Sequence, residues 1–316
     1  MALVGIARLA AQSPLLQAKR AVQYFDIPSR SILNRTKPGM PFTWTINPYR
    51  GCEFACKYCY ARYTHEFMEM APEHFEDKIY AKAASADLLR RELRRVRPGE
   101  HIAIGTATDP YQPAERRFLR TRAMLEVFAQ RRGYHLGIVT KSDLVTRDVD
   151  LLTQIARANV LGIHLTITTT DEKLARLMEP RAPRPALRLE AVRKLSEAGL
   201  PVGVNANPVM PGITDSVSSL ARLAKAAKDA GARTLGGGSI FLMPAAQTVF
   251  FLFIEREFPD LSPRYRALFN RSAYLNREYK DMLARRVTAI RQRYGLDSGA
   301  MEYRPELWPA EQGSLF

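Results

Sequence analysis

The sequence predicts an α/β fold, a partial (β/α)6 barrel of the TIM type with an N-terminal extension and a C-terminal helical region. Short apolar runs alternate with stretches of helical periodicity, the pattern of repeated βα units around a parallel sheet. The alternation covers roughly 200 residues, whereas a full (β/α)8 barrel needs about 250. We therefore expect an extension over residues 1–40, a barrel core over 41–245, and a helical region with a tail over 246–316.

Six apolar runs bounded by polar or turn-forming residues are the expected strands. They are Phe42–Asn47, His101–Gly105, His135–Thr140, Gly162–Thr168, Pro201–Asn205 and Thr234–Leu242.

Five amphipathic stretches between these strands are the expected barrel helices. They are Ala83–Val96, Leu119–Arg131, Thr146–Ala158, Arg184–Ala198 and Ser216–Ala230. Two of them run into a glycine, Gly199 or Gly231, which commonly ends a helix.

The C-terminal region is expected to be helical over Phe250–Phe258 and in one long amphipathic stretch, Pro263–Tyr294. We expect these helices to close the open side of the barrel and to shape substrate choice. The residues of interest there are several arginines and the tyrosines Tyr265, Tyr274 and Tyr279.

The composition is that of a globular enzyme, with a strong excess of positive charge. Lys and Arg number 47 and Asp and Glu 32, which gives a net charge of +15. Such a charge is typical of proteins with DNA or another polyanion as partner, although arginines on solvated helix faces would also produce it. The most apolar run, Thr248–Ile254, is far shorter than the roughly 20 residues that span a bilayer, so we expect no membrane partner and a cytoplasmic location.

All three cysteines of the chain lie in one run with the spacing C-x3-C-x2-C. Cys52, Cys56 and Cys59 follow the first expected strand, and loops after strand ends form the active sites of parallel α/β folds. Three thiolates could hold a [4Fe–4S] cluster and leave one iron open to a substrate or cofactor. A zinc site with His65 as fourth ligand is an alternative, and a disulfide with one free thiol is disfavoured in a reducing compartment.

The cysteine spacing, with Tyr58 just before the third cysteine, resembles the radical S-adenosylmethionine (SAM) superfamily. The segments Asn47–Cys52, Cys59–Arg62 and Gly105–Pro113 are further similar to a bacterial radical SAM group related to spore photoproduct lyase and labelled DNA repair photolyase-like. The resemblance implies a [4Fe–4S] cluster, SAM, and an external one-electron reductant of the flavodoxin or ferredoxin type. In that family the reduced cluster cleaves SAM to methionine and a 5′-deoxyadenosyl radical that abstracts hydrogen from a substrate.

The resemblance also implies roles for individual residues, each of which could instead be structural. Its expected SAM contacts are Tyr58 against the adenine, Thr108 and Asp109 near the methionine ammonium, Lys141, Thr166 and Arg188 near the carboxylate or ribose, and Asn205 near SAM or substrate. Tyr60 is expected to face the substrate, and the candidate catalytic residues are Tyr60, Tyr111 and Asp109.

One departure from the lyase concerns the return of hydrogen to the product. The lyase has a further cysteine for this step, and this chain has no fourth cysteine, so Tyr60 or Tyr111 would have to serve instead. We therefore expect either a repair-type reaction on DNA or radical chemistry on a small molecule or protein side chain. A non-enzymatic zinc-binding scaffold is the third alternative.

Overall fold

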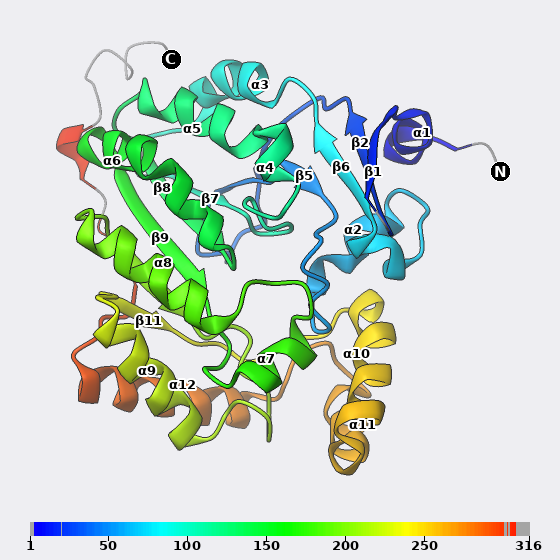
Figure 1. Ribbon diagram of the computed structural model, residues 1–316, viewed down its shortest axis with the longest axis vertical. Helices are drawn as coiled ribbons and strands as arrows, with labels where there is room; N and C mark the ends of the chain where they lie inside the picture. Colours follow the sequence, from blue (N-terminus) through cyan, green and yellow to red (C-terminus); the bar gives the residue numbers. More distant parts are fainter. Residues whose placement is uncertain (1–2, 20, 300–301, 303, 308–316) are drawn as a thin grey trace.

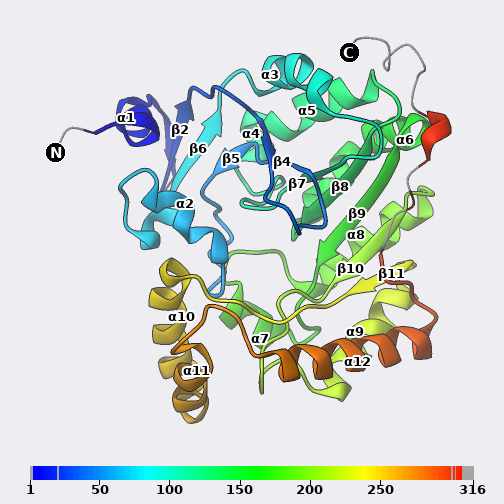
Figure 2. The same ribbon diagram turned by 180° about the vertical axis from the view of Figure 1, so that it is seen from behind.

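The main sheet of the protein has seven strands, six of them parallel. The computed structural model describes residues 3–19, 21–299, 302 and 304–307. In it, the sheet has the order β11-β10-β9-β8-β7-β4-β3 (Figures 1 and 2). Its strands are β3 (Leu33–Arg35), β4 (Trp44–Ile46), β7 (His101–Ile104), β8 (His135–Thr140), β9 (Val160–Thr166), β10 (Val202–Asn205) and β11 (Thr234–Gly236).

The six expected strands are all present, parallel, and adjacent in chain order, so the mixed α/β architecture is confirmed. β3 pairs antiparallel with β4 at one edge of the sheet. The two edge strands, β3 and β11, do not pair with each other within the described residues, so the sheet is open there. The exact six-unit barrel stays a prediction.

Helices cover one face of this sheet (Figure 1). They are α3 (Ser85–Glu92), α5 (Arg120–Ala129), α6 (Val149–Ala158), α8 (Pro185–Glu197), α9 (Val217–Asp229) and α12 (Arg277–Tyr294). Between helices and sheet lies the main core, to which the strands contribute every second residue. These are Trp44, Ile46, Ile102, Ile104, Leu136, Ile138, Leu161, Ile163, Leu165, Val202, Val204 and Leu235.

The opposite face of the sheet, here called the inner face, has a different composition. Strands of a parallel sheet usually read as continuous apolar runs because both faces are buried in apolar surroundings. Here the alternate positions are mostly small or polar. In register across the sheet they are Thr45, Ala103, Gly137 and Gly162; then Val139, His164, Gly203 and Thr234; then Thr166, Asn205 and Gly236.

A second, smaller sheet is built from the N-terminal extension and the segment before α3. Its order is β1 (Leu15–Lys19), β2 (Val22–Ile27), β6 (Lys78–Lys82) and β5 (Tyr49–Arg50). β2 and β6 run parallel, and β5 pairs antiparallel with β6. α1 (Gly5–Gln12) precedes this sheet. The extension is therefore structured, and the small sheet was missed because the pairing of β2 with β6 is not a local sequence pattern.

The C-terminal region departs from expectation in two places. The strand expected over Thr234–Leu242 ends at Gly236, because three successive glycines give the backbone there no side chains to pack. The long helix expected over Pro263–Tyr294 is divided into α11 (Ser262–Phe269) and α12, whose start is capped by the Asn276 side chain. α10 (Pro244–Glu257) begins earlier than expected, at a proline.

The remaining elements are short. They are α2 (Tyr63–Glu66), α4 (Glu115–Phe118), α7 (Glu172–Met178) and the 3-10 helices η1 (Tyr60–Arg62), η2 (Pro72–Glu76), η3 (Leu93–Arg95), η4 (Asp143–Asp148), η5 (Pro259–Leu261) and η6 (Pro305–Leu307). No helix among the described residues has the length and apolar character needed to cross a membrane.

Lys82 at the end of β6 is buried, and this gives a prediction about pH. Burial, reinforced by the charge of Arg50, lowers the pKa of Lys82 from 10.5 to about 7. Between these values the unfolded chain binds a proton that the folded chain lacks, so the free energy of unfolding rises with pH. The increase is at most about 1.4 kcal/mol per pH unit.

The substitution Lys82→Met should remove this slope and stabilise the protein at pH 7 and below. Urea unfolding between pH 6 and pH 9 measures it, and Lys78→Met on the same strand serves as the matched control. Equal pH slopes for the wild type and Lys82→Met would contradict the assignment.

Candidate active site

The three cysteines lie in the loop of residues 51–59, here called the thiol loop, between β5 and η1. Backbone hydrogen bonds hold it at both ends: the Cys52 N–H donates to the Phe75 carbonyl at 2.9 Å, and the Lys57 N–H donates to the Met178 carbonyl at 2.9 Å. Gly51 at φ 79° lies so close to β6 that an added Cβ would be 2.7 Å from the Lys78 carbonyl oxygen. Only glycine fits there, so the loop begins tightly against the small sheet.

The fully buried side chain of Arg62 holds the backbone of the thiol loop. Arg62 donates to the Cys56 carbonyl at 3.2 Å and to the Pro72 carbonyl at 3.0 Å, and it forms an ion pair with Glu76 at 2.5 Å. Its guanidinium also lies 5.9 Å from the centre of the Phe75 ring. A planar guanidinium can bind several oxygens at fixed angles, so Arg62 fixes the backbone of the loop.

The donor set of the thiol loop fits an iron–sulfur cluster. All three thiols are free, and they lie in an apolar cluster with residues such as Phe54, Met178, Met210 and Phe250. Burial raises the pKa of Cys56 to about 12 and also raises the pKa of Cys52 and Cys59. Binding of an iron centre by these thiols would displace their protons, because a cysteine binds metal as the thiolate.

A single zinc ion fits less well. Within the described part of the chain, no three His, Cys, Asp or Glu side chains converge closely enough to hold one metal ion. Thiolates that bind three different irons of a cluster need not converge on one point. His65, the candidate fourth zinc ligand, is buried beside Phe75, and its Nε2 lies 3.1 Å from the Lys78 carbonyl oxygen. Burial lowers the pKa of His65 to about 4.

Three of the predicted SAM-binding residues come together with a residue that was not among them, Glu179. The Tyr58 hydroxyl donates to the Glu179 carboxylate, and Arg188 forms an ion pair with Glu179 at 2.5 Å. The Lys141 ammonium lies 5.6 Å from the centre of the Tyr58 ring. Burial opposes the charge on Glu179, but Arg188 and Lys141 outweigh it and lower its pKa. Glu179 is thus an ionised, buried anchor.

Arg188 and Lys141 differ in how far their donors are used. Arg188 also donates to the Pro183 carbonyl at 2.8 Å and to the Thr166 carbonyl at 3.0 Å, so its guanidinium is engaged by the protein itself. The Nζ of Lys141 makes no hydrogen bond to any described residue. Burial opposes its charge, yet Cys56 and Glu179 raise the pKa of Lys141 above its ordinary value. A charged donor is therefore left available beside the thiol loop.

Thr108 and Asp109 tie the loop after β7 to its neighbours. The Thr108 hydroxyl donates to the Gly51 carbonyl at 2.6 Å, and Gln112 donates to the same carbonyl at 3.1 Å. The Asp109 carboxylate accepts from the Thr140 hydroxyl at 2.6 Å and from the Lys141 N–H at 2.7 Å. Burial raises the pKa of Asp109 above its ordinary value. Thr108 thereby positions the thiol loop, and Asp109 positions the end of β8.

The two tyrosines predicted as hydrogen donors lie in different places. The Tyr60 hydroxyl donates to the Thr106 carbonyl, and its ring packs on Phe241, 4.8 Å between ring centres. Tyr111 is fully buried in the main core, whereas Tyr60 packs against the cluster that holds the thiols. The structure thus brings only Tyr60 to the thiol loop.

Asn205 and Thr166 lie on the inner face, where neighbouring glycines leave room. Thr166 ends β9 and Asn205 ends β10, and the two residues are in register. A Cβ at Gly236 would lie 2.3 Å from the Asn205 side-chain oxygen, so the glycine leaves room for the Asn205 side chain in this position. The polar inner face was missed from the sequence. A period of two inside strands that were assigned to a parallel sheet is the signal that could have revealed it.

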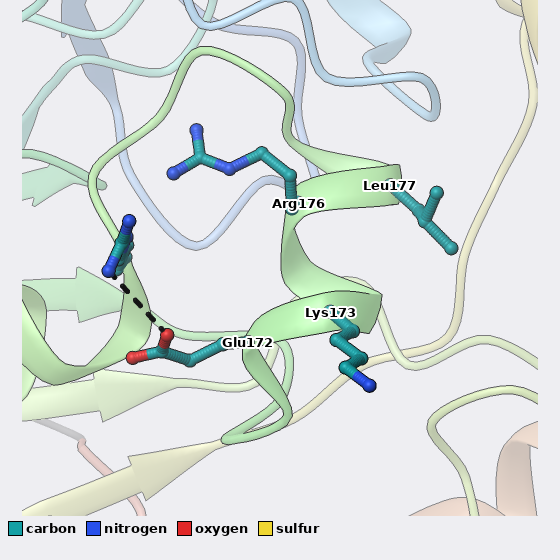
Figure 3. Close-up of a pocket in the computed structure, with 5 residues that line it drawn as sticks. Glu172, Lys173, Arg176 and Leu177 are labelled. Atoms are coloured by element: carbon teal, nitrogen blue, oxygen red, sulfur yellow. Dashed lines mark ion pairs between the residues drawn. The ribbon is translucent and has the colours of Figure 1, made fainter.

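A surface pocket of about 440 Å3 lies on α7, outside the buried Glu179–Arg188 pair. Figure 3 shows Glu172 turned toward the guanidinium with which it forms an ion pair, that of Arg184 at 3.9 Å. A narrower cavity beside it is lined by residues of the same pocket together with Glu179 and Arg188. The pocket therefore adjoins the outer wall of the site.

Sequence comparison matches residues 46–227 to the Radical SAM superfamily. An uncharacterised protein of Mycobacterium tuberculosis is 34% identical over 315 residues, which covers 96% of this chain and 90% of the relative. An uncharacterised protein of Methanocaldococcus jannaschii is 31% identical over 199 residues, 61% of this chain and 70% of the relative.

Comparison with solved structures finds the same fold in spore photoproduct lyase. A cysteine-to-serine mutant of that protein has a TM-score of 0.67 at 17% identity, covering 88% of this chain and 82% of the lyase. The lyase complexed with dinucleoside spore photoproduct has a TM-score of 0.65 at 15% identity, with the same coverage. The family match spans more than half of the chain and includes the thiol loop, and the chain therefore belongs to the radical SAM superfamily.

Proposed function

We propose that this radical SAM enzyme cleaves SAM and uses the product radical to abstract a hydrogen atom from nucleic acid. When bound by Cys52, Cys56 and Cys59, a [4Fe–4S] cluster reduced by a flavodoxin- or ferredoxin-type donor supplies one electron, which splits SAM into methionine and a 5′-deoxyadenosyl radical. Membership of the superfamily implies both cofactors. The reducing cytoplasm is the compartment that suits such thiols.

The observation that carries this proposal concerns the inner face of the main sheet, which is polar and rich in glycine. The thiol loop lies at one edge of this face, where Thr108 after β7 contacts Gly51. The side chains of His101 and Thr234 lie against Gly137 and Gly203, so these glycines make room for polar neighbours, and Thr166 and Asn205 add polar groups where β9 and β10 end. Ligand sites in proteins present a few placed polar groups of this kind. The strand ends beside the thiol loop are thus suited to the polar groups of SAM.

The protein residues have separate tasks in this proposal. Lys141 binds the SAM carboxylate, because its charged Nζ is half-buried and has no hydrogen-bond partner among the described residues. Arg188 and Glu179 hold Tyr58 in place, since their own donors and acceptors are engaged. The ring of Tyr58 then offers a flat surface beside the thiol loop for the adenine.

Nucleic acid is the proposed substrate class on two grounds. The chain carries a net charge of +15, which favours a polyanion. The solved lyase of the same fold was captured with a dinucleoside spore photoproduct. The chain has no cysteine beyond the three in the thiol loop, so Tyr60 is the proposed hydrogen donor to the product and the reaction need not be that of the lyase.

Substitution of Cys56 tests the cluster and the reaction together. After anaerobic reconstitution the wild type should contain about four irons per chain and release 5′-deoxyadenosine when reduced with dithionite in the presence of SAM. Cys56→Ala should lose both the visible absorption of the cluster and 5′-deoxyadenosine release. A colourless wild type that binds one zinc would contradict the proposal, and Ser218→Ala on the exposed start of α9 is the control.

Lys141→Met tests the SAM contact without removing a cluster ligand. A hydrogen bond to a charged group contributes about 1.5–3 kcal/mol, so the Kd for SAM should rise about 10- to 150-fold while the iron content stays that of the wild type. Equilibrium dialysis with the reconstituted protein measures both quantities. Lys173→Met, on the surface of α7, is the matched control and should leave the Kd unchanged. An unaltered Kd in Lys141→Met would refute this role.

The salt dependence of binding tests the nucleic-acid partner. The affinity for duplex DNA should fall steeply with salt, with a slope of about −0.9 in log K against log salt for each phosphate contacted. Fluorescence anisotropy over a salt series measures this slope. SAM binding in the same series is the control and should change little. DNA affinity that is absent, or independent of salt, would leave a small molecule or protein side chain as the substrate.

A further inference from the structure

Three aromatic rings from different parts of the chain form a continuous row that starts at the thiol loop. Tyr60 follows Cys59 directly, and its ring centre is 4.8 Å from that of Phe241, in the segment after β11. Phe241 in turn stacks on Tyr274, with 5.5 Å between ring centres and 21° between ring planes. We call these three residues the aromatic stack. It leads from the site toward solvent.

The outer end of the aromatic stack is held by backbone contacts. Tyr274 lies in residues 270–276, between α11 and α12, and forms an antiparallel bridge with Phe241. The Leu242 N–H donates to the Ala273 carbonyl at 2.8 Å, and the Ser272 hydroxyl accepts from the Tyr274 N–H at 3.0 Å. Figure 2 shows the segment after β11 and the α11–α12 connection on the same side of the molecule. The ring is therefore positioned in advance of any ligand.

Tyr274 differs from the two other tyrosines expected to matter in this region. Tyr265 is fully buried and donates to the Pro211 carbonyl at 2.9 Å. Tyr279 donates to the Asp215 carboxylate at 2.9 Å. Tyr274 is 56% exposed. Among the described residues, its ring stacks only on Phe241 and its hydroxyl forms no hydrogen bond. One face of its ring is thus open to a further planar group.

A positive charge accompanies this open ring. Arg271, three residues before Tyr274 in the same connection, is exposed and forms no ion pair or hydrogen bond with any described residue. Arg277, at the other end of the connection, has a carboxylate partner, Asp281, at 3.5 Å. An aromatic surface beside an unpaired cation is the combination by which proteins bind single-stranded nucleic acid, because bases stack and phosphates are neutralised.

We propose that Tyr274 is a stacking site for a nucleobase, with Arg271 binding a phosphate of the same strand. This inference rests on the nucleic-acid substrate class of the proposed function and names where the strand lies relative to the site. A base on Tyr274 is separated from Tyr60 by the ring of Phe241, so the bound strand lies at the outer end of the aromatic stack and the thiol loop at its inner end. An aromatic peptide could use the same ring, but the unpaired Arg271 and the charge of +15 favour the polyanion.

A tryptophan reporter tests the stacking directly. Tyr274→Trp retains a ring, and its fluorescence should be quenched by a single-stranded oligothymidylate of about eight nucleotides, within the usual range of site sizes. Leu252→Trp, at another exposed position on α10, is the matched control and should not be quenched. An abasic strand of the same length separates stacking from charge, because it offers phosphates without bases.

Binding constants complete the test. Tyr274→Ala should weaken oligothymidylate binding about 5- to 150-fold and leave abasic-strand binding unchanged, whereas Tyr274→Phe should bind like the wild type. Arg271→Gln should reduce the salt slope for either strand by about one.

The failures of the two proposals are distinguishable. Equal oligothymidylate affinity in the wild type and Tyr274→Ala overturns the stacking site, while a steep salt slope in both would retain the nucleic-acid substrate. If the wild type binds neither oligothymidylate nor duplex DNA, the substrate class and the stacking site are overturned together, whereas binding of duplex DNA alone overturns only the stacking site. Quenching of Tyr274→Trp by an aromatic peptide but not by oligothymidylate overturns the inference in favour of a protein partner.

Discussion

Alternate residues of each strand in the main sheet face two different environments, the helices on one side and the inner face on the other. The outer positions pack against helices and are mostly isoleucine, leucine and valine, whereas the inner positions are largely glycine, threonine, asparagine and histidine. The apolar area buried on the outer side alone must hold the helices in place. The inner side instead packs polar side chains against glycines, as His101 does at Gly137 and Asn205 at Gly236. That division gives the sheet one apolar face and one polar face.

A second constraint concerns the buried charged side chains near the thiol loop, each of which needs an oppositely charged or hydrogen-bonding partner. Arg62 with Glu76, and Arg188 with Glu179, meet it through ion pairs and carbonyl contacts. Replacing such pairs by apolar residues is often neutral or stabilising, so their presence is weak evidence for a role in stability. Their contacts instead fix the Cys56 carbonyl and the Tyr58 ring. Lys141 stands apart because its Nζ has no such partner among the residues that the structure describes.

The sequence predicted the six parallel strands, their order and the position of the cysteines, because these depend on local periodicity and spacing. It did not predict the small sheet, since β2 pairs with β6 across more than fifty residues of chain. Nor did it predict Glu179 as the partner of Tyr58 and Arg188, which requires three separate segments to meet. Tyr111 and Tyr60 were indistinguishable as tyrosines near strand ends, and only the packing separates the core position from the one beside the thiol loop.

The small sheet also has a bearing on the order in which the protein is made. All four of its strands lie within residues 15–82, so they leave the ribosome before β7 to β11, which form most of the main sheet. Domains of nascent chains begin to fold from the N-terminal side. The thiol loop can therefore acquire its backbone anchor, the carbonyl of Phe75 in η2, early in synthesis. Met178, Met210 and Phe250, which cover the thiols, are made later. The three thiols are therefore least covered while these later segments have yet to be made.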